Sequence, residues 1–156
     1  MVKPLKTFPL LAGLSDEEFA AVEQRIKTQH YHKGDIIIKK GEPSRHLLFL
    51  LEGEVDIIDF DAEGGEVWIA TITPGQFFGE LALILNEPRS ADAVATQAST
   101  VARLPREYAL SLLTEHPSAA KEMMRHLALT IKQQNLHLHM LNQPSATERI
   151  DRKSVV

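Results

Sequence analysis

The chain has 156 residues, enough for one domain with a sizeable core and an additional helix, and its lack of cysteine excludes disulfides, thiol nucleophiles and cysteine-ligated iron–sulfur clusters. The formal net charge of −4 argues against nucleic acid as a direct partner. No apolar run is long enough to span a membrane and no signal peptide is visible, so we expect a cytoplasmic protein.

The first 28 residues are expected to form a helical segment. Ser15 is suited to cap a helix at its amino terminus, and Glu18 completes a capping box with it. Apolar residues follow at helical spacing, namely Phe19, Val22 and Ile26. They predict one apolar helix face that packs against the domain that follows.

Residues 29–116 show the pattern of a β-barrel. Short segments rich in β-branched and apolar residues alternate with glycine-marked turns about every ten residues, without long helices between them. The expected strands are 35–40, 46–51, 55–60, 66–72, 91–95 and 100–104. The fold class that we expect is therefore mainly β with flanking helices, an antiparallel jelly-roll barrel.

Helical character returns after residue 104. Pro105 to Leu113 predicts a short helix, and Pro117 is suited to the first position of a long one that reaches residue 142. From Ala120 to Leu141 apolar residues repeat at steps of four and three, interrupted by Gln134. Such a seam predicts a homodimer through two helices packed side by side. An amphipathic helix folded on its own barrel is the alternative.

Residues 77–93 hold the features that carry chemistry. A short apolar helix, Leu81 to Leu85, is opened by Gly79 and bracketed by the charges of Glu80 and Arg89. The exposed N–H groups of such a helix favour an anion, and the guanidinium fork fits two oxygens of one phosphate. An ionised carboxylate only accepts hydrogen bonds, so Glu80 suits a hydroxyl beside the phosphate. Together these residues predict a site for a ribose phosphate with one negative charge, although Glu80 and Arg89 taken alone also fit a surface ion pair.

The same stretch resembles the phosphate-binding cassette of cyclic nucleotide-binding domains, as found in the catabolite activator (CRP)/FNR superfamily and in regulatory subunits of cAMP-dependent protein kinase. The matching residues are Phe78-Gly79-Glu80-Leu81-Ala82-Leu83 and Pro88-Arg89-Ser90-Ala91. The resemblance implies that Glu80 binds the ribose 2′-hydroxyl, that Arg89 binds the exocyclic oxygens of the cyclic phosphate, and that Ser90 adds its hydroxyl and N–H. The other pocket residues implied are Phe78, Gly79, Leu81, Ala82 and Ala91.

In that superfamily the long carboxyl-terminal helix dimerises and closes over the nucleotide base. The resemblance therefore implies base contacts from Thr130, Gln134 and Asn135. Ser145 to Ile150 resembles the hinge before a winged helix-turn-helix domain, but the tail of residues 143–156 is too short to hold one. We expect no DNA binding by this chain alone, and it is either an excised sensor domain or a module that acts on a protein partner.

These features predict a cyclic nucleotide sensor of the Crp/Fnr type that signals through its carboxyl-terminal helix, with cAMP as ligand and cGMP as the alternative. A jelly roll also suits a metal-dependent enzyme, but the segment from Tyr31 to Leu104 holds only His32 and His46 and shows no catalytic pairing. We therefore predict no enzyme and no metal. A helix-mediated interaction module with a vestigial nucleotide pocket remains as a third hypothesis.

Overall fold

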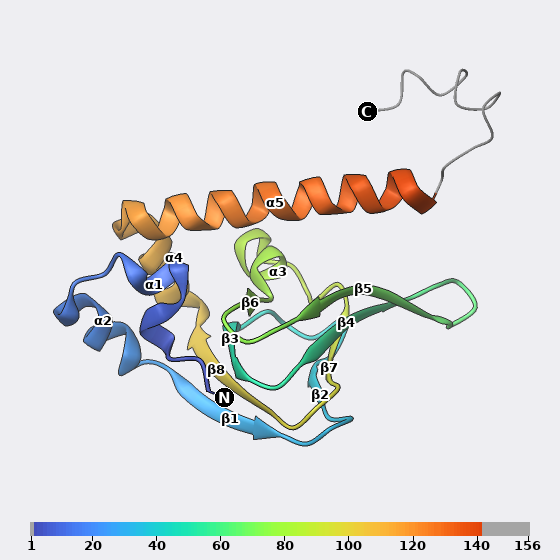
Figure 1. Cartoon of the computed structure of the whole chain (residues 1–156), viewed down its shortest axis with the longest axis horizontal. Helices are drawn as coiled ribbons and strands as arrows, with labels where there is room; N and C mark the ends of the chain where they lie inside the picture. Colours follow the sequence, from blue (N-terminus) through green and yellow to red (C-terminus); the bar gives the residue numbers. More distant parts are fainter. Residues whose placement is uncertain (1, 142–156) are drawn as a thin grey trace. The chain divides into compact units, whose positions relative to one another are not determined.

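The computed structural model describes the backbone of residues 2–141 and the side chains of residues 2–136 (Figure 1). The predicted tail, 143–156, lies outside the described residues. The chain divides into two units, residues 1–120 and the part from residue 121 onward, and each is described by itself.

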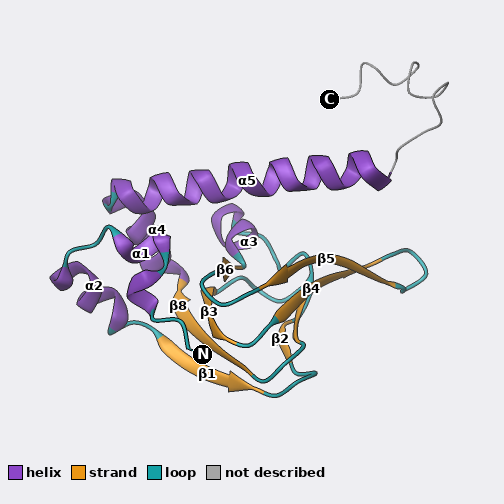
Figure 2. Ribbon diagram, viewed as in Figure 1, coloured by secondary structure: helices purple, strands orange, loops and turns teal. Residues whose placement is uncertain are grey.

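The first unit is built on two antiparallel sheets of four strands each (Figure 2). The strand order is β1-β8-β3-β6 in one sheet and β2-β7-β4-β5 in the other. The strands are β1 (Lys27–Tyr31), β2 (Ile36–Ile38), β3 (His46–Glu52), β4 (Val55–Phe60), β5 (Glu66–Ile72), β6 (Phe77–Phe78), β7 (Asp92–Ala95) and β8 (Ser99–Pro105). Neighbours that are distant in sequence, such as β1 and β8, pair antiparallel, which confirms the jelly-roll barrel that the sequence predicted.

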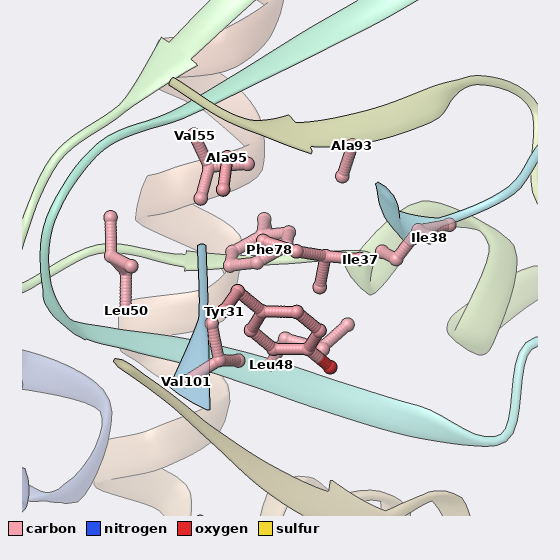
Figure 3. Close-up of a cluster of buried hydrophobic side chains, with 10 residues drawn as sticks. All are labelled: Tyr31, Ile37, Ile38, Leu48, Leu50, Val55, Phe78, Ala93, Ala95 and Val101. Atoms are coloured by element: carbon pink, nitrogen blue, oxygen red, sulfur yellow. The ribbon is translucent and has the colours of Figure 1, made fainter. Parts of the chain in front are cut away.

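The core of the barrel lies between the two sheets (Figure 3). Its buried residues are Tyr31, Ile37, Ile38, Leu48, Leu50, Val55, Phe78, Ala93, Ala95 and Val101. Strand β3 is buried on both faces, because Leu48 and Leu50 face this core while the ring of Phe49 packs edge-on against that of Phe8, 5.4 Å between centroids. Burial on both faces explains why β3 is a continuous apolar run rather than an alternating one.

Helices lie before, between and after the barrel strands, and the last of them is long. They are η1 (Leu5–Thr7), α1 (Pro9–Ala12), α2 (Asp16–Glu23), α3 (Glu80–Leu85), α4 (Arg106–Glu115) and α5 (Pro117–Leu141). The predicted capping box is confirmed, since the Ser15 hydroxyl accepts from the Glu18 N–H and the Glu18 carboxylate accepts from the Ser15 N–H.

The expectations for the amino-terminal segment hold only in part. Helix α2 ends at Glu23, before Ile26, and none of its residues is fully buried, although the expected apolar residues Phe19, Val22 and Ile26 are half-buried. The fully buried residues of this segment lie before α2, namely Phe8, Leu10, Leu11 and Leu14. Strand β1 also begins at Lys27, within the segment expected to be helical. It is an edge strand with one buried residue, so it lacks the apolar alternation that marks a strand in sequence.

Helix α5 begins at Pro117, as predicted, and runs to Leu141. Most of it belongs to the second unit. Homodimerisation through this helix stays a prediction. In the described part of the chain, no helix combines the length and apolar character that a membrane crossing requires.

Candidate functional site

The site predicted around Glu80 and Arg89 begins where β6 turns directly into α3. Gly79 precedes the helix with a left-handed φ of 83°. A Cβ at this position would lie 2.5 Å from Nη1 of Arg89 and 3.1 Å from Cδ1 of Leu48. Both the backbone conformation and the close approach of Arg89 therefore require glycine.

Arg89 is buried and holds three segments of the barrel together. Its Nη1 donates to the carbonyl oxygen of Gly79 and its Nη2 to that of His46, each at 2.7 Å. Its backbone N–H donates to the carbonyl of Glu42 at 2.8 Å, and its own carbonyl accepts from the N–H of Gly41 at 2.9 Å. The side chain is only 7% exposed, so the guanidinium is fixed at the start of α3.

The charges around Arg89 oppose one another. Burial lowers the pKa of its guanidinium, and the positive charge of Arg103 lowers that pKa further, while Glu80 and Glu42 raise it. Glu80 is itself buried, with 8% of its surface exposed. A buried guanidinium is poorly screened by water, so an anion that reaches it is attracted more strongly than at an exposed arginine.

The carboxyl end of α3 is held by residues that the sequence did not single out. The hydroxyl of Ser44 contacts the carbonyl oxygens of Ala82 at 3.0 Å and Glu87 at 2.9 Å. Nε of Arg106 donates to the carbonyl of Leu83 at 3.1 Å. The carbonyls of Ala82 and Leu83 also accept backbone N–H groups of Glu87 and Asn86, so Ser44 and Arg106 add second donors at this helix end. Ser44 and Arg106 lie far from α3 in sequence, and no motif announces them.

The other predicted cassette residues differ in how far they are buried. Phe78 and Ala82 are buried, Ala91 is half-buried, and Leu81 and Ser90 are exposed. The residues that the structure brings together are Gly79, Glu80 and Arg89. Thr130, Gln134 and Asn135 lie on α5 in the second unit, so their part in the site stays a prediction.

A hollow of about 610 Å³ opens beside the turn that follows α3. Its walls include Ser44, Glu87 and Arg106 but neither Glu80 nor Arg89. This hollow is therefore separate from the predicted ligand site. Among the described residues, no three His, Cys, Asp or Glu side chains gather where they could hold a metal ion.

Comparisons with known proteins converge on this region. The family model described as the cyclic nucleotide-binding domain matches residues 28–116. The cyclic AMP receptor protein of Thermus thermophilus is 30% identical over 146 residues, which cover 94% of this chain and 68% of that protein. Glutaminase 1 of Bradyrhizobium diazoefficiens is 38% identical over 120 residues, 77% of this chain but only 19% of the glutaminase.

A solved structure gives the same result in three dimensions. The crystal structure of the Thermus thermophilus catabolite activator protein superposes with a TM-score of 0.73 at 30% identity, covering 85% of this chain and 62% of that one. The chain thus spans between about a fifth and two thirds of the relatives that it matches.

Proposed function

The chain belongs to the cyclic nucleotide-binding domain family, and on that premise we propose that it is a sensor that binds a cyclic nucleotide, cAMP in preference to cGMP. One observation carries the proposal. The guanidinium of Arg89 is buried beside the charge of Glu80 and is fixed by two backbone carbonyls at the start of α3. An arginine has five N–H donors, so the two carbonyls leave others that suit phosphate oxygens.

In the proposed complex, Arg89 binds the exocyclic oxygens of the cyclic phosphate and Glu80 accepts a hydrogen bond from the ribose 2′-hydroxyl. The exposed hydroxyl of Ser90 donates to the phosphate. Gly79 leaves room for the guanidinium of Arg89, since a side chain at this position would strike it. The remaining proposed lining residues are Phe78, Leu81, Ala82 and Ala91.

The proposed domain organisation assigns a separate task to each part of the chain. Residues 29–116 bind the nucleotide, and the segment 1–28 covers one face of the barrel. The helix of residues 117–142 carries Thr130, Gln134 and Asn135 to the base and forms a homodimer. A ligand that binds one arrangement of this helix better than another shifts the population toward it, which is how the signal leaves the domain. The name of the Thermus relative, a cyclic AMP receptor, supports cAMP as the ligand.

Isothermal titration calorimetry with cAMP and cGMP tests the proposal. We expect Glu80→Gln and Arg89→Ala each to weaken cAMP binding more than tenfold, because each removes charge-assisted hydrogen bonds to the ligand. The matched control is Glu87→Gln, which removes an exposed carboxylate just after the end of α3. Equal affinities for the native protein and Glu80→Gln would defeat the site assignment, and tighter binding of cGMP would correct the ligand.

A helix-mediated interaction module is the second candidate, favoured by apolar side chains exposed along α5. Met124 is 64% exposed and Ile131 is 58% exposed. If native protein gives no heat with either nucleotide but sediments as a dimer that Ile131→Glu dissociates, this second candidate replaces the first. We propose no catalytic role for either candidate.

A further inference from the structure

A second hollow, of about 350 Å³, lies where β1, β8 and the beginning of β3 meet. We call it the basic pocket, and the residues that define it are Arg25, Lys27, Thr28, Gln29, His46 and Arg103. Three of these residues carry a positive charge at neutral pH, and no carboxylate lines the hollow. Its volume is at the lower end of the range for small-molecule sites.

Two of the cations face each other across neighbouring strands. Lys27 of β1 is directly opposite Arg103 of β8 in the antiparallel register. Like charges in directly opposite positions destabilise a sheet. Within residues 2–136, neither of them forms an ion pair with a carboxylate that would offset this repulsion. The pairing is therefore costly unless an anion lies between the two side chains.

Arg103 also has incomplete hydrogen bonding. Its Nη2 donates to the hydroxyl of Tyr31 and to the carbonyl oxygen of Ile37. Its Nε is buried and has no hydrogen-bond acceptor among the described residues. A buried donor without an acceptor costs free energy, so Arg103 gains from an acceptor oxygen that enters beside it.

The positive field extends beyond the walls of the basic pocket. Burial lowers the pKa of His46, and the charges of Arg103, Arg89, Arg45 and Lys27 lower it further. A neutral imidazole at the wall adds hydrogen-bonding capacity without adding to the repulsion among the cations.

Arg25 is held at the rim of the basic pocket by an aromatic ring. Its guanidinium carbon lies 4.6 Å from the centroid of Tyr108, within the range of a cation–π contact. This contact restricts a long side chain that is otherwise exposed. A ligand at the rim therefore meets an arginine that is already positioned.

We propose that the basic pocket is an anion site that binds the phosphate groups of a small phosphorylated molecule. A guanidinium fork fits two oxygens of one phosphate, and a lysine ammonium supplies a point charge for a second phosphate. The site uses side chains from β1, β3 and β8, and its ligand is independent of the cyclic nucleotide proposed for the cassette. The inference therefore goes beyond the proposed function and does not rest on it.

The test is a titration of the full chain with pyrophosphate at low ionic strength, followed by NMR of the backbone amides and of the His46 ring. We expect saturable shifts of amides in β1 and β8 and a higher pKa for His46 when the anion offsets the neighbouring cations. Lys27→Gln and Arg25→Gln should each weaken binding about fivefold, the upper range for one exposed charge pair. Lys33→Gln, an exposed lysine outside the basic pocket, should leave the affinity unchanged.

Two further arms decide the position and the chemistry of the site. Arg89→Ala removes the cassette arginine, and we expect it to retain saturable shifts in β1 and β8. Pyrophosphate binding that disappears in Arg89→Ala and survives in Lys27→Gln would place the anion at the cassette and overturn the proposal. Unchanged affinity in both Lys27→Gln and Arg25→Gln would also overturn it. Succinate that binds as tightly as pyrophosphate would overturn the assignment to phosphate.

Discussion

The cassette and the basic pocket both gather positive charge in the same barrel, but they stabilise it in different ways. At the cassette a buried guanidinium, Arg89, rests on the carbonyls of Gly79 and His46 and lies in the field of Glu80. In the basic pocket, Lys27 and Arg103 face each other without a carboxylate on the walls.

This difference separates the two roles that a cation can play. The acceptors around Arg89 are part of the fold, so Arg89 contributes to stability as well as to the proposed ligand site. In the basic pocket Lys27 is exposed to solvent and Arg103 is half-buried, and repulsion between the two works against the fold. Substitutions of Arg89 and of Lys27 should therefore change the free energy of unfolding in opposite directions.

The largest effect is expected for Arg89→Ala. The substitution leaves the carbonyls of Gly79 and His46 without their donors, and hydrogen bonds to a charged group are the stronger kind. We expect the free energy of unfolding to fall by about 3 kcal/mol, measured by urea denaturation. Arg45→Ala, an exposed arginine on the neighbouring loop, is the control. A loss no larger than that of Arg45→Ala would mean that the two carbonyls find water readily.

Gly79→Ala should have the next largest effect. Glycines 79 and 64 both have positive φ, at 83° and 82°, but a Cβ at Gly64 meets no atom within 4 Å. Gly64→Ala therefore measures only the cost of a left-handed backbone conformation for a residue with a Cβ, about 1 kcal/mol. For Gly79→Ala we expect about 2 kcal/mol or more, because the methyl group also displaces Arg89. If thermal unfolding gives equal losses for the two variants, the close approach of Arg89 to Gly79 is not required.

Lys27→Gln should act in the opposite direction. Removing one of two like charges on neighbouring strands relieves repulsion, so the free energy of unfolding should rise by up to about 0.5 kcal/mol. The gain should shrink in high salt, which screens exposed charges. Lys33→Gln is again the matched control, and a destabilised Lys27→Gln would contradict the cost that we assign to this pair.

The smallest effect concerns the pH dependence of stability. His46 has a pKa below its ordinary value of 6.5 in the folded chain, first because of burial and then because of nearby cations. As the pH falls through 6.5, the unfolded chain therefore binds more protons than the folded chain does. The contribution of a neutral His46 to the free energy of unfolding is full above that pH and declines below it. We expect His46→Asn to lose less stability than native protein between about pH 7 and pH 5. His32→Asn, an exposed histidine, is the control, and identical pH profiles for the native protein and His46→Asn would refute the prediction.

The sequence predicted the local structure of residues 79–89 better than that of their surroundings because the signals there are contiguous. Gly79, α3 and Arg89 fall within a dozen residues, and each has a local physical reason to be there. The barrel followed from the spacing of glycine-marked turns between apolar segments. Strand β1 was missed because all its residues except Tyr31 are exposed, and the helix expected to reach Ile26 ends at Glu23, although Phe19, Val22 and Ile26 are half-buried.

The contacts that the sequence did not predict join residues far apart in the chain. Ser44 precedes the cassette by several strands, yet its hydroxyl contacts carbonyl oxygens at the end of α3. The basic pocket combines Arg25, His46 and Arg103, which come together only through the antiparallel register of β1, β8 and β3. A net charge of −4 also gives no hint of a local positive field, because a total says nothing about distribution.

The two carbonyl contacts of Arg89 have a consequence for the thermodynamics of recognition. An arginine side chain has about 2 kcal/mol of rotamer entropy, much of which is lost when the side chain is immobilised. Because Gly79 and His46 already fix this side chain, folding has removed that freedom before any phosphate arrives. An incoming nucleotide then finds a pre-organised partner, and its affinity depends on the new contacts rather than on ordering a flexible cation.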